Sequence, residues 1–268
     1  MNIRKSKDLD VPILKALWSQ CFHDEDEYIN LYFQNRFVSE HVLVLEIEKT
    51  IAGMIHLLPC RISPSQPSLY WYAACIDEQF RGKGYFRSFC KAVFAENRKK
   101  GFANICLPVE GLEDFYRSIG FQYSYSQVRI PVAIDKREPS VCEPVKAEAK
   151  DFRLLFQNPG SLKWDDAAID YAIGENRLCG GEAYKITLNQ VEYPYFVVRT
   201  TNGIRIENTN LDEVTGKAVA QRMMIQFGVK HAELRLQCKR NLPQKTVFGL
   251  SDHPDVERDF AQMTFTLA

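Results

Sequence analysis

Residues Tyr72–Phe86 read YAACIDEQFRGKGYF and carry the clearest structural signal in the chain. Apolar and aromatic residues predict a strand over 69–77, and apolar residues at three- to four-residue spacing predict a helix that begins near Phe86. The turn between them contains Gly82 and Gly84. Glycine lets backbone N–H groups come close to an anion, and a helix N-terminus adds unpaired donors and the positive end of its dipole. The pattern therefore predicts a diphosphate-binding turn; a plain strand-to-helix turn is the alternative.

The segments on either side predict a mixed sheet of strands with helices. Upstream, we expect a helical region at 10–37 and strands at 42–49 and 51–62, which form an antiparallel meander with the strand before the turn. Downstream, we expect a helix that ends at Gly101, a strand at 103–107, a short helix at 111–118 and a strand at 121–130. A strand, a turn, a helix and another strand in this order imply a parallel pair with a crossover helix.

Known phosphate-binding motifs narrow the choice of family. The GxxxxGK[ST] motif of phosphate loops is absent, and a single Gly-x-Gly after an antiparallel meander differs from the GxGxxG of dinucleotide-binding sheets. The combination resembles the GCN5-related N-acetyltransferases (GNAT), whose main motif is Gln/Arg-x-x-Gly-x-Gly/Ala after the fourth strand. Arg81-Gly82-Lys83-Gly84-Tyr85-Phe86 matches this motif through Gly84, and Phe86 stands where the family prefers Gly or Ala.

A second segment adds to the resemblance, which spans about residues 1–130. Phe115-Tyr116-Arg117-Ser118-Ile119-Gly120-Phe121 is similar to the family's Phe-Tyr-x-x-x-Gly-Phe segment and lies at the usual distance downstream. In many members, the tyrosine hydroxyl protonates the departing CoA thiolate, which requires a proton donor within hydrogen-bond reach of the sulfur. The resemblance implies that Tyr116 is this general acid; a core tyrosine beside Phe115 is the alternative.

The resemblance also implies how acetyl-CoA is held as a co-substrate. Its diphosphate would bind at the glycine turn, formed by Arg81, Gly82, Lys83, Gly84, Tyr85 and Phe86. The preceding strand splays from its neighbour in this fold, so the backbone of Cys75, Ile76 and Asp77 would bind the acyl and pantetheine parts and polarise the thioester carbonyl. No general base is assigned; the candidates near the implied cleft are Asp77, Glu78, Glu110, Glu113 and His56. The aromatic residues Trp71 and Tyr72 line either an acceptor pocket or the core.

The second half repeats the order of elements without the glycine turn. A proline-rich, charged linker is expected at 136–150, between a GNAT domain at 1–135 and a second domain at 151–268. Beyond it we expect a helix around Trp164–Tyr171, strands at 182–188, 191–199 and 203–209, a helix at 213–227, and strands at 229–237 and 260–267. The expected fold is α/β (α+β): a GNAT fold whose mixed central sheet has an antiparallel N-terminal meander and a parallel pair around the CoA-binding helix, followed by a smaller, degenerate GNAT-like or accessory half.

Composition excludes several classes of protein. The 268 residues carry a formal net charge of zero, so no basic surface for nucleic acid is implied. No apolar run approaches the roughly 18 residues of a membrane span, and we expect a cytoplasmic protein with no membrane partner. None of the eight cysteines forms a CxxC pair, which predicts reduced thiols and no metal site.

The sequence leads to an acyl-CoA-dependent N-acetyltransferase that transfers acetyl directly to a primary amine. The acceptor is a small molecule or a peptide, and neither its identity nor the oligomeric state can be read from the sequence. The first alternative is a non-catalytic domain that kept the fold and CoA binding. An aminoacyl-transferring two-lobed relative is a third possibility, against which the neutral charge and the intact glycine turn argue.

Overall fold

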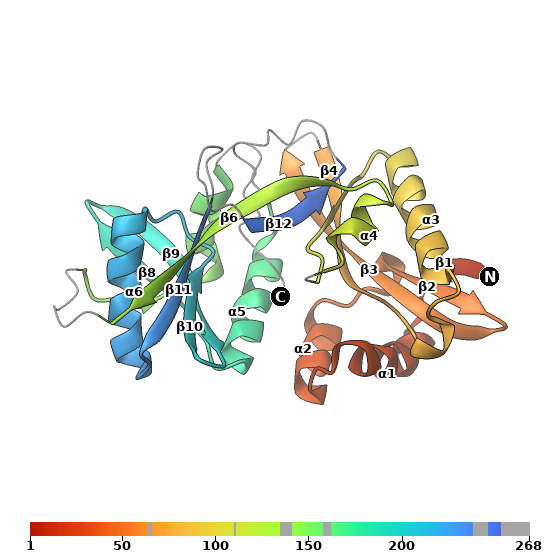
Figure 1. Cartoon of the computed structure of the whole chain (residues 1–268), viewed down its shortest axis with the longest axis horizontal. Helices are drawn as coiled ribbons and strands as arrows, with labels where there is room; N and C mark the ends of the chain where they lie inside the picture. Colours follow the sequence, from red (N-terminus) through yellow and green to blue (C-terminus); the bar gives the residue numbers. More distant parts are fainter. Residues whose placement is uncertain (64–65, 110, 135–140, 158–161, 238–245, 253–268) are drawn as a thin grey trace. The chain divides into compact units, whose positions relative to one another are not determined.

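The structure is a computed structural model that describes residues 1–63, 66–109, 111–134, 141–157, 162–237 and 246–252. The chain divides into two compact units (Figure 1). Unit 1 comprises Met1–Tyr123 together with residues 249–252, and unit 2 comprises the described residues between Ser124 and Phe248. The limits 1–135, 136–150 and 151–268 stay predictions, but the 136–150 segment contains part of a sheet and the start of a helix.

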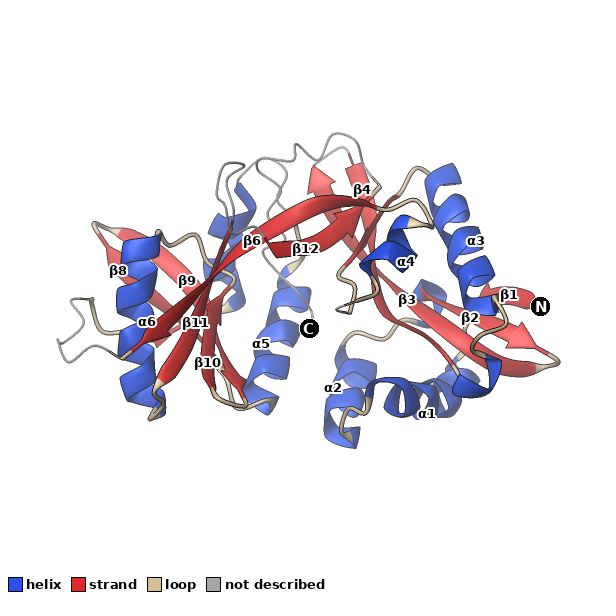
Figure 2. Cartoon of the chain, in the orientation of Figure 1, coloured by secondary structure: helices blue, strands red, loops and turns tan. Residues whose placement is uncertain are grey.

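Unit 1 has a mixed sheet with helices on both faces (Figure 2). Its strands are β1 (Asn2–Lys5), β2 (Val42–Ile47), β3 (Thr50–Ser63), β4 (Gln66–Ile76), β5 (Ala103–Cys106) and the end of β12 (Thr246–Ser251), in that order across the sheet. Its helices are η1 (Asp8–Asp10), α1 (Val11–Phe22), α2 (Asp26–Asn35), η2 (Ser39–His41), η3 (Glu78–Phe80), α3 (Tyr85–Lys99) and α4 (Glu113–Arg117). The meander, the glycine turn and the crossover helix are confirmed, whereas β1 and β12 were not expected.

The direction of each strand follows from its connection. Hairpins join β2, β3 and β4, which are antiparallel, and the crossover helix α3 makes β5 parallel to β4. Strand β12 pairs antiparallel with β5, with Leu250 opposite Cys106, so a segment from the end of the described chain completes the sheet. The amphipathic α3 buries Phe89, Cys90 and Val93 against one sheet face, while Trp18 of α1 packs on the other face against Tyr72.

A buried polar network fixes β12 to unit 1. The Asn104 side-chain oxygen accepts from Trp71 Nε1 at 3.0 Å and from Asn97 Nδ2 at 2.7 Å. Asp252 accepts from the backbone N and the Nδ2 of Asn104, at 2.7 and 3.0 Å. All four residues are buried, and a buried donor without a partner is costly. The network therefore joins β4, α3, β5 and the end of β12.

Unit 2 repeats the element order of unit 1. Its sheet runs in the order β6 (Gln122–Ala133), β11 (His231–Gln237), β10 (Gly203–Glu207), β9 (Val191–Thr200), β8 (Glu182–Leu188) and β7 (Val145–Lys146). Its helices are η4 (Ala149–Gln157), α5 (Asp166–Leu178) and α6 (Glu213–Phe227). The antiparallel β8, β9 and β10 lead through α6 to a parallel β11, which confirms the expected repeat. The strand predicted at 260–267 lies outside the described residues.

Loss of the Asp252 carboxylate should destabilise the fold. Asp252→Ala leaves two buried donors of Asn104 without acceptors, and we expect the free energy of unfolding to fall by about 2–4 kcal/mol. Urea denaturation followed by tryptophan fluorescence measures the change. Asp114→Ala is the matched control, because among the described residues this exposed aspartate has an ion pair with Arg117 on its own helix, and its loss should cost less than about 0.5 kcal/mol. Equal losses in the two variants would contradict the role of the network.

Candidate active site

The turn between β4 and α3 presents backbone donors without side-chain cover. Gly82 and Gly84 have φ values of 75° and 78°, in the left-handed region that favours glycine. Gly84 is the N-cap of α3 and no side chain caps the helix, so the first-turn N–H groups have no intrahelical partner. A Cβ at either glycine would meet no heavy atom within 4 Å. The glycines are therefore required by backbone conformation, and the donors are accessible to a ligand.

Cationic side chains surround this turn. Arg81 Nε donates to the carbonyl oxygen of Ile76 at 3.2 Å, which holds the guanidinium beside the end of β4. Lys83 Nζ donates to Gln79 O at 3.1 Å and lies over the Phe80 ring. Both side chains belong to exposed residues. Together with the positive end of the α3 dipole, they favour an anion at the turn.

The Phe86 side chain packs against the short helix α4. Its ring stacks on Phe115 of α4, with centroids 5.6 Å apart and planes at 8°. Arg87 lies over the Phe115 ring, with its guanidinium carbon 5.2 Å from the ring centroid. Phe86 and Tyr85 both pack against the core of unit 1. The large side chain at the position where the family prefers Gly or Ala therefore links α3 to α4 and leaves the turn open.

Strands β4 and β5 part before β4 ends. Their pairing runs from Ser68–Ala103 to Trp71–Cys106, whereas β4 continues to Ile76. The register between β3 and β4 shifts in this stretch, and Ala73 adopts a φ of 45°, as at a β-bulge. The last residues of β4, from Tyr72 to Ile76, are thus unpaired with β5, as the resemblance to GNAT proteins implies.

The backbone at Cys75–Asp77 is only partly available to a ligand. The Asp77 amide donates to Ala52 O on β3 at 2.8 Å, so it is engaged within the sheet and is a poor candidate for polarising a thioester. Backbone groups of successive strand residues face opposite sides, so the Ile76 amide faces the side on which β5 has ended. The Cys75 carbonyl lies close to Gly53 of β3, and a side chain at Gly53 would clash with it.

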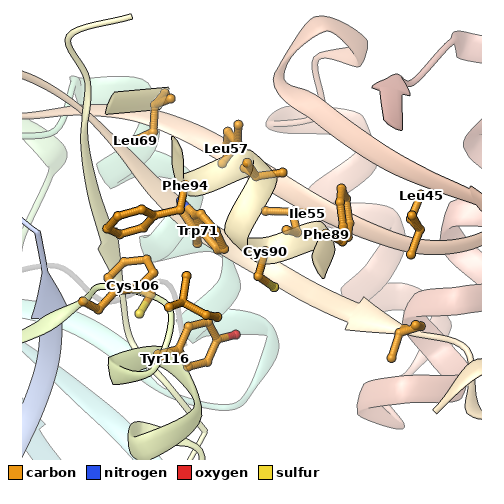
Figure 3. Packing of buried hydrophobic residues seen from close by; sticks show 14 of the residues in the cluster. Leu45, Ile55, Leu57, Leu69, Trp71, Phe89, Cys90, Phe94, Cys106 and Tyr116 are labelled. Carbon is orange, nitrogen blue, oxygen red and sulfur yellow. The ribbon is translucent and has the colours of Figure 1, made fainter. Parts of the chain in front are cut away.

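Tyr116 lies at the edge of the unit 1 core (Figure 3). Its side chain packs edge-on against Phe115 and Phe121, and the residue is 7% exposed. Burial, and then the nearby Cys106 and Cys90 thiols, raise the pKa of Tyr116 well above its usual value. Within the described residues, its hydroxyl makes no hydrogen bond to the protein. Tyr116 is therefore a protonated donor at neutral pH, held rigidly by aromatic packing.

Several expected candidates for a base or an acceptor pocket belong to the core. His56 is fully buried and its Nδ1 lies 2.8 Å from the Tyr32 hydroxyl. Trp71 and Tyr72 are also buried, and the indole of Trp71 belongs to the Asn104 network. Asp77 caps η3 by accepting from Gln79 N at 2.8 Å. Glu110 lies outside the described residues, and the general base stays unassigned.

The corresponding turn of unit 2 has different chemistry. The N-cap of α6 is Asp212, whose carboxylate accepts from the backbone N and the hydroxyl of Thr215, each at 2.9 Å. The carboxylate uses a helix donor and places a negative charge where a diphosphate would bind. Gly216 serves packing, because a Cβ there would lie 2.7 Å from Leu234. The residues of this turn do not fit a diphosphate.

Comparison with known proteins agrees with this geometry. The turn, the parted strands and the element order define an acyltransferase fold. Residues 2–124, just under half of the chain, match the family described as Acetyltransferase (GNAT) domain, so this part of the chain is similar to the GNAT acetyltransferases. No curated protein sequence matches the chain.

Solved structures share the fold over almost the entire chain. A conserved protein of unknown function and probable N-acyltransferase from Enterococcus faecalis V583 is 14% identical, with a TM-score of 0.70 over 93% of this chain and 71% of that chain. A GCN5-related N-acetyltransferase from Anabaena variabilis is 15% identical, with a TM-score of 0.68 over 93% and 72%. Eis1 from Mycobacterium abscessus is 11% identical, with a TM-score of 0.65 over 96% and 75%. The likeness extends over both units, so the fold of each unit has counterparts in these solved structures.

The described residues contain neither a cluster of metal ligands nor a membrane-spanning helix. No three His, Cys, Asp or Glu side chains gather there in a way that could hold a metal ion. None of the helices that the structure describes has the length and apolar character of a membrane span.

The buried state of His56 predicts an acid-sensitive fold. Burial lowers the pKa of His56 to about 3 from the usual 6.5, so the unfolded state binds an extra proton between these values and stability falls as the pH drops below 6.5. At pH 5 this linkage costs about 2 kcal/mol, at 1.36 kcal/mol per pH unit. His56→Gln can still accept from Tyr32 but cannot titrate. Urea denaturation should show that this variant loses about 2 kcal/mol less than the parent between pH 7 and pH 5; equal losses would show that His56 is not the cause.

Proposed function

We propose that unit 1 transfers an acetyl group from acetyl-CoA directly to a primary amine of a small molecule or a peptide. The observation that carries the proposal is the uncapped, glycine-bounded start of α3, located directly after the strand end that β5 leaves unpaired. The first feature fits a diphosphate and the second fits the extended pantetheine and acyl chain. Both fit without a metal ion, because backbone donors and the helix dipole supply the positive field.

Each group of the site has a distinct part in the proposed reaction. The turn and its cations hold the diphosphate, and the Ile76 amide lies on the side where it can polarise the thioester carbonyl. The amine nitrogen attacks that carbonyl carbon, the carbon–sulfur bond breaks, and the sulfur leaves with the electron pair. Tyr116 donates its hydroxyl proton to the sulfur, and the proton released by the amine balances the reaction. The products are the N-acetylated amine and CoA.

The raised pKa of Tyr116 suits this role. A free thiol has a pKa near 8.5 and a tyrosine near 10, and burial raises the latter further. The hydroxyl therefore keeps its proton throughout the neutral range and transfers it only when a thiolate forms beside it. Fixed packing against Phe115 and Phe121 removes the entropy cost of positioning the donor.

The glycine turn is tested by a pair of equivalent substitutions. Gly84→Asp adds a carboxylate beside the diphosphate, and we expect the dissociation constant of acetyl-CoA to rise at least about tenfold, equivalent to 1.4 kcal/mol. Gly101→Asp is the matched control, since Gly101 also has a positive φ and open space around its Cα. The control adds the same strain and charge at the other end of α3. Calorimetry should show that this variant binds acetyl-CoA with an affinity within about twofold of the parent. Similar effects in both variants would refute the proposed cofactor site.

The role of Tyr116 is tested by removing only its hydroxyl. Tyr116→Phe keeps the ring packing, so the melting temperature and the acetyl-CoA affinity should stay nearly unchanged. The rate of transfer should fall at least tenfold, because general acid catalysis contributes roughly 100- to 10,000-fold. The assay measures CoA release by chromatography over a panel of primary amines.

Tyr195→Phe is the matched control for that experiment. Tyr195 is also buried, and its hydroxyl contacts Met223 in the core of unit 2. The Tyr195→Phe substitution should leave the rate of acetyl transfer unchanged. If Tyr116→Phe turns over within about twofold of the parent while the chemical step limits the rate, Tyr116 is a core residue. If the parent binds acetyl-CoA but acetylates no amine, unit 1 is a non-catalytic CoA-binding domain.

A further inference from the structure

Two cysteines from distant parts of the sequence meet beside the proposed acyl site. Cys21 is in the last turn of α1, and Cys75 is the penultimate residue of β4. The side chains of Cys75 and Cys21 interact with each other. Cys21 Sγ also lies 3.5 Å from the carbonyl oxygen of Ile76. The Cys21 sulfur therefore contacts the backbone of the residue that follows Cys75, and the two cysteines are neighbours at the end of β4.

The surroundings of Cys21 favour its thiolate. Arg81 Nη2 approaches the Cys21 sulfur to 3.6 Å. The hydrogen bond from Cys75, and then Arg81, lower the pKa of Cys21 to about 7 against the opposing effect of partial burial. A thiolate is the reactive form of cysteine in oxidation and exchange. Because Cys21 is only partly buried, small oxidants can reach it.

The other cysteines of unit 1 lack this combination. Cys60, Cys90 and Cys106 are buried, and burial raises the pKa of each thiol. Burial also raises the pKa of Cys75, and its hydrogen bond to Cys21 keeps the proton on Cys75. Cys21 is thus suited to react first, and Cys75, its neighbour at the end of β4, is suited to react second.

We propose that Cys21 and Cys75 form an oxidisable thiol pair that a peroxide converts into an intramolecular disulfide. The Cys21 thiolate attacks one oxygen of the peroxide, the oxygen–oxygen bond breaks, and Cys21 becomes a sulfenic acid while hydroxide leaves. The Cys75 sulfur then attacks the Cys21 sulfur, and the hydroxyl group leaves as water with the Cys75 proton. The two sulfurs lose two electrons in total, which reduce one hydrogen peroxide to two waters.

The disulfide would join α1 to the strand end that carries the proposed acyl contacts. Arg81 would lose the thiolate it contacts and keep its bond to Ile76 O. The pair is thus a modification site in its own right, and it stands independently of whether unit 1 transfers acetyl groups. The test therefore measures disulfide formation and not acetyl transfer.

The test treats the full chain with hydrogen peroxide, blocks free thiols by alkylation, and maps tryptic peptides by mass spectrometry. Trypsin separates Cys21 in peptide 16–36 from Cys75 in peptide 62–81. We expect these two peptides to be joined in a form that dithiothreitol reverses. Before oxidation, Cys21 should be alkylated at least about tenfold faster at pH 7 than Cys60. Absence of the joined peptides, or equal alkylation of Cys21 and Cys60, would overturn the proposal.

Three variants separate the pair from general oxidation. Cys75→Ser should stop the reaction at a Cys21 sulfenic acid, which dimedone traps. Cys21→Ser should leave Cys75 reduced, because the buried thiol lacks an activated partner. Cys60→Ser is the matched control and should still give the joined peptides. Oxidation of Cys75 in Cys21→Ser at the parent rate would also overturn the proposal.

Discussion

The hydrogen bonds of the Asn104 side chain are the constraint on which the candidate site depends. Its oxygen accepts from β4 and α3, and its amide nitrogen donates to Asp252 at the end of β12. The glycine turn connects β4 to α3, so the position of the turn follows from how these two elements are held together. A fully satisfied buried amide fixes that arrangement more specifically than apolar packing, because any displacement leaves a buried polar atom without a partner.

The same constraint explains why the N-terminal unit needs residues from the far end of the chain. Asp252 and Asn104 are 148 positions apart, and β12 covers the edge of β5 that would otherwise be exposed. An exposed strand edge is a site for wrong pairing. The element order that repeats in unit 2 therefore does not make the two halves separable modules. The repeat diverged in its chemistry where α6 begins, because an acidic N-cap occupies the place of a glycine.

Local patterns in the sequence were sufficient for most of the fold. A few neighbouring residues were enough to recognise the apolar spacing of α3, the glycine after its end and the alternation in unit 2. The two motifs indicated the resemblance to GNAT proteins and the position of the turn. Contacts between distant residues could not be predicted in this way. Nothing near Thr246–Ser251 indicates that this strand pairs with β5, and nothing near Cys21 indicates that it meets Arg81. The isolated Gly53 in a predicted strand was a usable sign of close backbone approach.

The side chain at position 86 shows how one contact changes the meaning of a motif. A phenylalanine at a position that usually holds Gly or Ala would block the turn if it pointed toward the phosphates. Its stacking on Phe115 instead ties the phosphate-binding helix to the short helix that carries Tyr116. The two motifs recognised separately in the sequence are thus joined physically in the core, and the proposed binding and proton-donating groups belong to one rigid unit.

The stoichiometry of acetyl-CoA binding to the full chain, measured by isothermal titration calorimetry, tests the assignment of the cofactor site most directly. The glycine-capped helix of unit 1 fits the diphosphate, and the Asp212-capped helix of unit 2 does not. We therefore expect one acetyl-CoA site per chain. Two equivalent sites would contradict the role assigned to the Asp212 cap, and no binding would contradict the role assigned to the glycine turn.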